Sequence, residues 1–235
     1  IPAQFDEVAG FSCGYARVKK DDVCHYIDTR GKIKYSINPP EDSPRYTGIR
    51  DDYIGDFRYN YALIMHYGST CYYGLIDRDF EYVIHPGECS GLQEVSENGY
   101  VPFTKDGWRW GYVTKDGVVI PSKFGYASSF RDGYAVVSAK MPDGYWGFGI
   151  IDAAGQYTMQ PRSLLYQPIS LGGGLFEYFE YVPLDGGSAI GCGVINSRGD
   201  TIHPAKAAID YSSAVDNGMI PVRNDMRNSY WYYMD

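Results

Sequence analysis

The side chains that could bind a metal ion are few and stand in repeated surroundings. Of the four histidines, His85 and His203 each lie in the tripeptide Ile-His-Pro, which indicates a strand end that recurs along the chain. His25 and His66 are isolated, and no carboxylate or second histidine stands beside them at the spacing of metal ligands. We therefore expect no bound transition metal and no other cofactor.

Three aspartates could pass for a catalytic set of carboxylates, namely Asp28, Asp77 and Asp152. Each ends the same short motif and precedes a turn, which indicates a structural role. Glycosidase acids must face one another across a sugar at a defined distance, and no pair stands out here. The segment 186–191 lacks the last glycine of a nucleophile elbow, and 172–174 lacks the lysine of a phosphate loop. We expect no enzyme; a hydrolase with loop-borne carboxylates is the least favoured alternative.

The five cysteines form no Cys-x-x-Cys motif and no metal-ligand spacing. Their odd number leaves at least one free thiol. Cys71 and Cys89 are the most plausible disulfide pair, because both are expected in loops of one repeat. The redox compartment stays open.

Charge and composition exclude several classes of protein. The net charge of −8 arises from 29 acidic and 21 basic residues spread along the chain, with no basic stripe for nucleic acid. The longest uncharged stretch, 163–176, contains a proline and three glycines, so no membrane-spanning segment is expected. Tyrosine occurs 24 times and leucine only eight times, which favours strands over helices. A helical bundle is thereby excluded.

One pentapeptide organises the chain. Trp-Gly-Tyr-Val-Thr at 110–114 has five counterparts, and the six copies end at positions 28, 77, 114, 152, 196 and 235. An aspartate at the last position and a glycine three residues later suit a tight turn between strands. In the second copy Phe80 replaces this glycine, so we expect that turn to differ. The glycine inside the pentapeptide predicts a close approach of neighbouring backbones or rings.

Two further blocks complete the unit. A block that begins Phe-x-x-Gly-Tyr-Ala precedes the pentapeptide, as at 11–18 and 130–137, and a block that ends Ile-Pro follows it, as at 117–121. Each unit therefore predicts three short strands, with room for a fourth near the aromatic residue after the proline. The fold class is all-β, with six units of roughly 40 residues.

These blocks resemble the WG repeat, also called KWG, most closely at 110–121 and 130–155. The resemblance covers nearly the whole chain and implies a single β-repeat domain over 1–235 with partial terminal units. It also implies a bacterial interaction module without a general assigned activity. An extracytoplasmic location (periplasm, cell surface or secreted) is favoured, although the sequence alone leaves location and oligomeric state open.

Two architectures suit six such units. One is a closed, propeller-like ring and the other is an open β-superhelix. The first two residues, Ile-Pro, match the end of the block that follows the pentapeptide, and the last residue ends a pentapeptide. A ring could complete one unit from both ends of the chain and remove exposed sheet edges. We favour the ring on this ground.

Two segments, 38–56 and 162–191, fall outside the repeated blocks and are expected to be loops inserted on one face. Exposed tyrosine and phenylalanine there would offer rigid contact area to a protein partner, or flat faces to a sugar. We expect a non-catalytic binding module that holds a protein partner, with glycan binding as the alternative. The candidate binding residues are Tyr46, Tyr53, Phe176, Tyr178, Phe179 and Tyr181.

Overall fold

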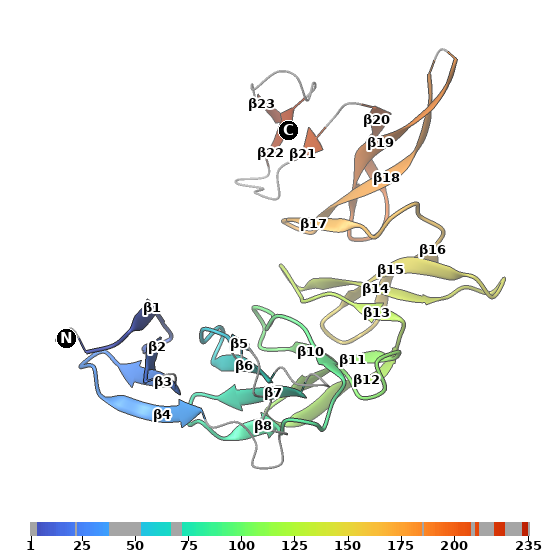
Figure 1. Cartoon of the computed structure of the whole chain (residues 1–235). Coiled ribbons are helices and arrows are strands. Elements are labelled where there is room, and N and C mark those ends of the chain that lie inside the picture. The colour runs from blue at the N-terminus through green and yellow to red at the C-terminus, as the bar shows by residue number, and fades with distance from the viewer. Residues whose placement is uncertain are drawn as a thin grey trace. The chain divides into compact units, whose positions relative to one another are not determined.

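The computed structural model describes residues 4–21, 23–37, 53–66, 72–184, 186–207, 210–211, 219–223 and 232–234. Over these residues the chain is all-β, without a helix, and its strands form six separate sheets (Figure 1). The chain divides into two compact units, Ile1–Ser122 and Lys123–Asp235. Each sheet is built from strands that are consecutive in the sequence, as the tandem blocks predict.

The first unit holds three sheets of four strands each, joined in sequence order. Neighbouring strands in these sheets pair antiparallel. The strands are β1 (Glu7–Ser12), β2 (Tyr15–Lys20), β3 (Val23–Asp28) and β4 (Ile33–Ile37), then β5 (Tyr53–Ile54), β6 (Tyr61–His66), β7 (Tyr72–Asp77) and β8 (Tyr82–Ile84), then β9 (Gly91–Leu92), β10 (Val101–Thr104), β11 (Trp110–Thr114) and β12 (Gly117–Phe124).

The second unit continues the same pattern with two four-stranded sheets and one of three described strands. These strands also pair antiparallel. They are β13 (Tyr126–Ala127), β14 (Tyr134–Lys140), β15 (Trp146–Asp152) and β16 (Tyr157–Arg162), then β17 (Ile169–Gly172), β18 (Leu175–Leu184), β19 (Gly187–Asn196) and β20 (Thr201–Ala207), then β21 (Asp210–Tyr211), β22 (Ile220–Arg223) and β23 (Tyr232–Met234).

In four of the sheets, the block that precedes the pentapeptide forms a two-residue turn between the first two strands. Both central residues have positive φ at 13–14, 59–60, 132–133 and 173–174. This is the requirement of a type I′ turn, whose twist matches that of paired strands. The second central residue is glycine in three of these turns and Asn60 in the other, because both residue types tolerate the left-handed conformation.

The fifth sheet differs from the sequence expectation. The segment 162–191 was expected as an inserted loop, but most of it forms β17, β18 and the start of β19. The type I′ turn at 173–174 and the strand after it are the fifth copy of the block that precedes the pentapeptide. The resemblance is hidden because Leu171 stands where Phe130 opens the fourth copy, and Phe176 stands in place of the small Ala135.

The backbone of the adjacent strand lies so close to the glycine of the pentapeptide that it leaves no room for a side chain. A Cβ on Gly111 would lie 2.5 Å from the Ile120 carbonyl oxygen, and one on Gly193 would lie 2.6 Å from that of His203. At Gly149 the Met159 oxygen would be 2.9 Å away. All these distances are shorter than van der Waals contact, so only glycine lets the third and fourth strands approach so closely. The predicted close approach is confirmed.

The turn after the pentapeptide is held by its aspartate. The Oδ1 atoms of Asp28, Asp77 and Asp152 each accept the N–H groups two and four residues further on, at 2.9 to 3.1 Å. Asn196 accepts the same two bonds in the fifth sheet, at 2.9 and 3.0 Å. These carboxylates are structural, as their recurrence predicts.

The expectation that the turn at Phe80 differs is wrong. Its N–H donates to the Asp77 carbonyl oxygen at 3.1 Å, as the glycines do in the other copies, and its φ is +64°. Phenylalanine thus occupies a left-handed conformation that disfavours a Cβ. Packing offsets this strain, because the Phe80 ring stacks on Tyr35 at 5.1 Å and meets Tyr15 edge-on at 4.9 Å.

The hydrophobic cores lie between successive sheets of each unit. In the first unit Tyr26 and Ile37 of the first sheet pack with Ile64 and Ile76 of the second. A second cluster joins the second and third sheets through residues such as Leu75 and Val101. In the second unit corresponding clusters join the fourth sheet to the fifth and the fifth to the sixth. A side chain is therefore buried when the neighbouring sheet covers its face.

Candidate interaction surfaces

The six residues predicted to bind are not brought together by the described structure. Tyr46 lies outside the described residues. The backbone of Tyr53 begins β5 and pairs with Met65. The remaining four residues all belong to β18, where successive side chains point to opposite faces of the sheet.

Phe176 and Tyr178 point into the core between the fourth and fifth sheets. Their side chains are 1% and 5% exposed, and they pack with Val136 and Ile150. The Tyr178 hydroxyl accepts the N–H of Ala205 at 3.2 Å, which satisfies the buried phenol. The expectation that they offer a contact surface is thus corrected, because the fourth sheet covers their face of β18.

Phe179 and Tyr181 lie on the opposite face of β18. Tyr181 is 65% exposed and stands directly across from Ile190, which is also exposed. The exposed ring of Tyr166 meets the half-buried ring of Phe179 edge-on at 5.7 Å. We call the four side chains Tyr166, Phe179, Tyr181 and Ile190 the hairpin patch.

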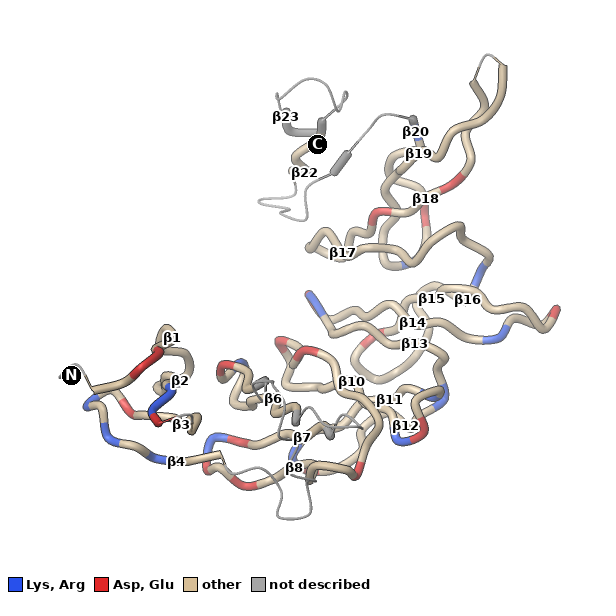
Figure 2. Tube along the Cα trace, viewed as in Figure 1, with Lys and Arg blue, Asp and Glu red and all other residues tan. Residues whose placement is uncertain are grey.

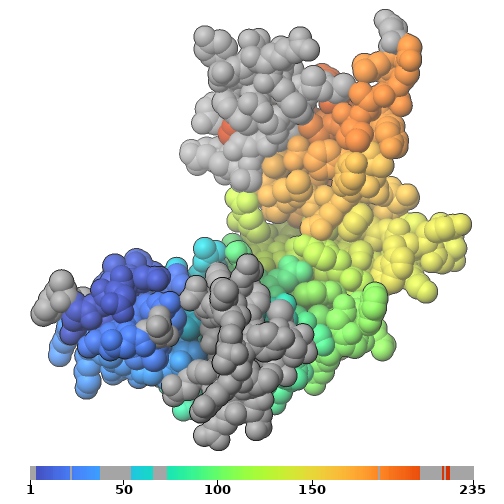
Figure 3. All heavy atoms as spheres, in the orientation of Figure 1, coloured from blue at the N-terminus to red at the C-terminus, as the bar shows by residue number. Residues whose placement is uncertain are grey.

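The hairpin patch extends onto a two-stranded ribbon. The registers of β17 and β20 reach only Glu177 of β18 and Gly191 of β19. Among the described residues, β18 and β19 pair only with each other beyond these points, up to Leu184 and Gly187. The end of this ribbon is exposed on the face drawn in Figure 3 and projects beyond β17 and β20 in Figure 1.

The charge on the two hairpin strands themselves is one-sided. The sequence contains no lysine or arginine between Arg162 and Arg198, whereas β18 carries Glu177 and Glu180 (Figure 2). Glu177 is buried on the face of the hairpin patch, and Glu180 is exposed on the other face. The ribbon is therefore apolar and acidic.

A second kind of surface was missed in the sequence. Among the described residues, the two most exposed aromatic side chains are Trp108, at 80%, and Tyr145, at 74%. Both lie in five-residue loops between the second and third strands of a sheet, at 105–109 and 141–145. Both follow an Asp-Gly pair, so we call these the Asp-Gly loops. The same Asp-Gly-aromatic triplet also occurs at 132–134, where Tyr134 is half-buried, so the triplet alone does not reveal an exposed ring.

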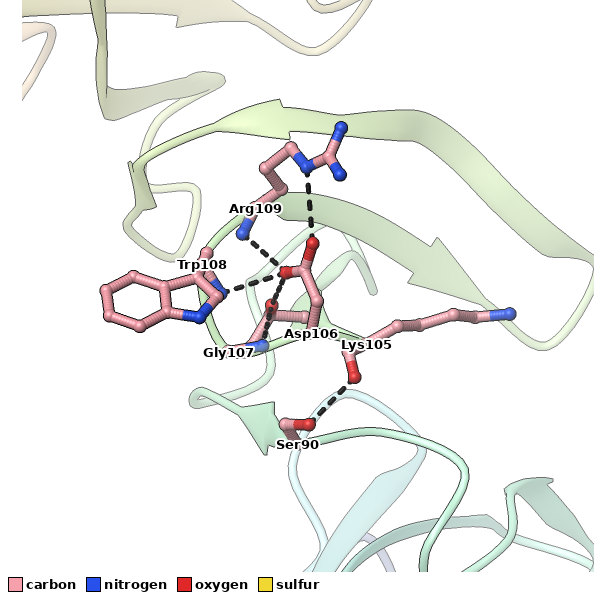
Figure 4. Close-up of polar contacts among 7 residues, drawn as sticks. Ser90, Lys105, Asp106, Gly107, Trp108 and Arg109 are labelled. Carbon is pink, nitrogen blue, oxygen red and sulfur yellow. Dashed lines mark hydrogen bonds and ion pairs between the residues drawn. The ribbon is translucent and has the colours of Figure 1, made fainter.

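The first Asp-Gly loop is held by Asp106 (Figure 4). Its Oδ1 accepts the N–H groups of Arg109 and Trp108 at 2.8 and 2.9 Å, and its Oδ2 accepts Nε of Arg109 at 3.2 Å. The backbone bond from Arg109, followed by that from Trp108, lowers the pKa of Asp106 to about 2. Across the loop Ser90 Oγ donates to the Lys105 carbonyl oxygen at 2.7 Å.

The second Asp-Gly loop repeats this construction. Asp143 Oδ1 accepts the N–H of Tyr145 at 3.0 Å, and Met141 and Tyr145 close the loop by a backbone bond of 2.8 Å. The next residue, Trp146, lies against Gly125, where a Cβ would stand 2.7 Å from its Cη2 atom. The exposed Tyr145 ring is thus followed in the sequence by the Trp146 indole, which packs on the Gly125 backbone.

The comparison with known families agrees with the repeated sheets. The family described as "WG containing repeat" matches residues 1–24, 73–107 and 110–140. The chain is a WG-repeat protein. Among solved structures it is similar to a protein of unknown function from Bacteroides caccae, at 11% identity and a TM-score of 0.33, over 85% of this chain and 80% of that one. No curated protein matches it.

The predicted disulfide of the WG-repeat protein is tested at Cys89. Cys89 is a buried free thiol whose Sγ lies 3.8 Å from the Tyr73 carbonyl oxygen, so the expected bond to Cys71 is not formed. Burial raises the pKa of Cys89 to about 11, which disfavours the reactive thiolate. Cys71 itself lies outside the described residues.

Metal-ligating groups do not gather in the described part of the WG-repeat protein: no three His, Cys, Asp or Glu side chains there could hold an ion together. His25 Nδ1 instead lies 2.8 Å from Ser36 Oγ, and the His85 ring stacks on Tyr82 at 4.9 Å. Within the same residues no helix is long and apolar enough to cross a membrane.

Proposed function

We propose that this bacterial WG-repeat protein is a non-catalytic binding module that holds a protein partner on the hairpin patch. The observation that carries the proposal is the row of Tyr166, Phe179, Tyr181 and Ile190 on one face of the β18–β19 hairpin. A two-stranded ribbon is marginally stable by itself in water. Contiguous exposed apolar side chains with rigid aromatic rings are typical of protein contact surfaces.

The use of the repeated carboxylates supports a role without catalysis. In Asp28, Asp77 and Asp152, one carboxylate oxygen accepts hydrogen bonds from two backbone N–H groups of its own turn. A general acid or base must instead reach the proton that it transfers. Phe179 and Tyr181 remain as candidate binding residues, whereas burial removes Phe176 and Tyr178 from the proposal.

The proposal is tested by photo-cross-linking in the source organism, with a photoreactive amino acid at position 181. We expect one dominant adduct, identified by mass spectrometry. In the purified pair, Tyr181→Ser with Ile190→Ser should weaken binding by about tenfold or more, the loss typical of hot-spot residues. The matched control is Val118→Ser, because Val118 is an exposed apolar strand residue of another sheet. Equal binding by both variants would contradict the proposal.

We further propose that the six units close into a propeller-like ring rather than an open superhelix. The recurrence of the four-stranded unit supports a regular array, and a closed array has no exposed terminal sheet. Small-angle X-ray scattering tests the closure. A compact ring of this length should have a radius of gyration of about 18 Å. A clearly larger value, with a profile typical of an extended particle, would indicate the superhelix.

A further inference from the structure

We propose that the two Asp-Gly loops are carbohydrate-binding sites, in which the rings of Trp108 and Tyr145 stack against neutral sugar residues of a polysaccharide. These sites are separate from the hairpin patch and do not depend on the proposed protein partner. Both loops occupy the same place in the repeat, between the second and third strands of the third and fourth sheets.

The fold does not explain these aromatic side chains. Trp108 and Tyr145 are 80% and 74% exposed, so neither contributes to a core between sheets. Each ring directly follows the Asp-Gly pair of its loop. Large aromatic rings left in water in the corresponding loops of two repeats favour a role in binding, because burial of such a ring by a ligand is favourable.

The loops hold their rings on ordered backbones. Gly107 and Gly144 have φ of +78° and +86°, and the preceding aspartate in each loop accepts the N–H of the aromatic residue. In the first loop Thr104 Oγ1 also accepts the N–H of Gly107 at 3.0 Å. A backbone fixed before binding loses less conformational entropy when a ligand arrives.

The surroundings of the rings favour a sugar over a protein. Trp108 is flanked by the exposed residues Lys105, Asp106, Gly107 and Arg109, and its indole points away from the Asp106 carboxylate (Figure 4). A protein interface of standard size covers about 800 Å² per partner and has an apolar centre. A single ring among polar groups instead matches a sugar, which has one apolar C–H face and a rim of hydroxyl groups.

The second loop offers a broader aromatic surface. Trp146 is exposed, and its ring rests on Gly125, so one part of the indole is supported while the rest faces water. Lys140 lies directly across from Trp146 and is exposed, which places an ammonium donor beside the ring. An alanine at position 125 would displace the indole without changing a charge.

Affinity gel electrophoresis of the whole chain tests the proposal, with a soluble β-1,3-glucan, a xylan, a galactomannan and amylopectin as the probes. We expect at least one of them to retard the protein. Trp108→Ala and Tyr145→Ala should each raise the apparent dissociation constant about 2- to 12-fold, the range expected for one aromatic contact. Gly125→Ala should weaken the second site alone, and Val118→Ala is the matched exposed control.

Tryptophan fluorescence gives a second readout. The retarding polysaccharide should change the emission of the wild type and of Tyr145→Ala, whereas the change should be smaller in Trp108→Ala. The variant with both Tyr181→Ser and Ile190→Ser should bind the polysaccharide as the wild type does, which separates this proposal from the protein partner. Absence of retardation by all four polysaccharides, or equal retardation of the Trp108→Ala, Tyr145→Ala double variant, would overturn the proposal.

Discussion

At the scale of single residues, the most constrained positions are glycines that no helix or turn requires. Gly111, Gly149 and Gly193 sit in regular strands, yet each faces the backbone of the next strand at less than contact distance for a Cβ. The obstacle is backbone, which cannot rotate away as a side chain can. The repeated Gly is therefore a packing residue and not part of a binding motif.

We predict that Gly111→Ala lowers the free energy of unfolding by about 1 to 3 kcal/mol, the range for inserting a methyl group into a filled space. Urea denaturation followed by circular dichroism measures the change. Gly10→Ala is the matched control, since Gly10 is also in a strand but has no atom within 4 Å of its Cβ position. A loss no larger than that of the control would contradict the packing explanation.

At position 80 we predict that glycine is more stabilising than alanine, the reverse of the usual order. In most strands or helices alanine is more favourable than glycine, but position 80 has a φ of +64°. Both Phe80→Ala and Phe80→Gly remove the ring that packs on Tyr35 and Tyr15. Phe80→Gly should nevertheless be more stable than Phe80→Ala by roughly 1 to 2 kcal/mol, because only glycine escapes the left-handed penalty.

The two Phe80 variants are compared by thermal and urea unfolding under the same conditions. Their difference cancels the lost aromatic packing, which both share, and leaves the backbone contribution. If alanine proved equal to or better than glycine, the turn at 77–80 would not have the conformation described here.

At the scale of elements, the Asp-Gly loop at 105–109 should be sensitive to acid. The pKa of Asp106 is lowered to about 2, below the ordinary carboxyl value of 3.8, by N–H bonds from Arg109 and Trp108. A lowered carboxyl pKa stabilises the folded loop above the ordinary pKa, and this contribution is lost as the pH falls through the folded value. We therefore predict that the loop is ordered at pH 5 and loosens progressively from about pH 4 to pH 2.

Amide hydrogen exchange of Trp108 and Arg109, followed by NMR across this pH range, tests the prediction. Asp106→Asn keeps a carbonyl acceptor but cannot titrate, so its protection should be nearly independent of pH. Asn196 holds a different turn, between the third and fourth strands of the fifth sheet, where its Oδ1 accepts the N–H groups of Arg198 and Asp200 at 2.9 and 3.0 Å. An amide oxygen can therefore accept two backbone bonds in a turn of this chain. Equal acid sensitivity in the variant would assign the loosening to another group.

At the scale of the whole molecule, the division into compact units falls inside a strand. Unit one ends at Ser122 and unit two begins at Lys123, but the strand β12 (Gly117–Phe124) continues across this boundary. We predict that the chain 1–235 unfolds as one domain in a single cooperative transition. Repeat arrays transmit stability through neighbouring units, and a strand that continues through the boundary maintains that coupling.

Scanning calorimetry measures this cooperativity as the ratio of the calorimetric to the van't Hoff enthalpy, which should be near one. Gly111→Ala, located in the first unit, should shift the entire transition to lower temperature. Two resolved transitions, of which only one moves in the variant, would show that the units are independent domains.

Much of the fold is predictable from the sequence because it is local. The tight turns, the strand order and the glycine of the pentapeptide depend on residues that are close in the chain, and each recurs in several copies. The fifth sheet was the exception, since Leu171 and Phe176 disguise a block that the turn at 173–174 still forms. Its strands were therefore expected to be a loop.

The binding surfaces were less predictable, because exposure depends on the sheet that covers each face. The sequence by itself determined a WG-repeat protein made of β-units of at least three strands with structural aspartate turns, and the structure adds the fourth strand. Only the tertiary structure decided that Phe176 and Tyr178 are buried against the fourth sheet, while Tyr181, on the other face of β18, is exposed. Alternation along a strand assigns a side chain to a face, but distant residues determine whether that face meets another sheet or water.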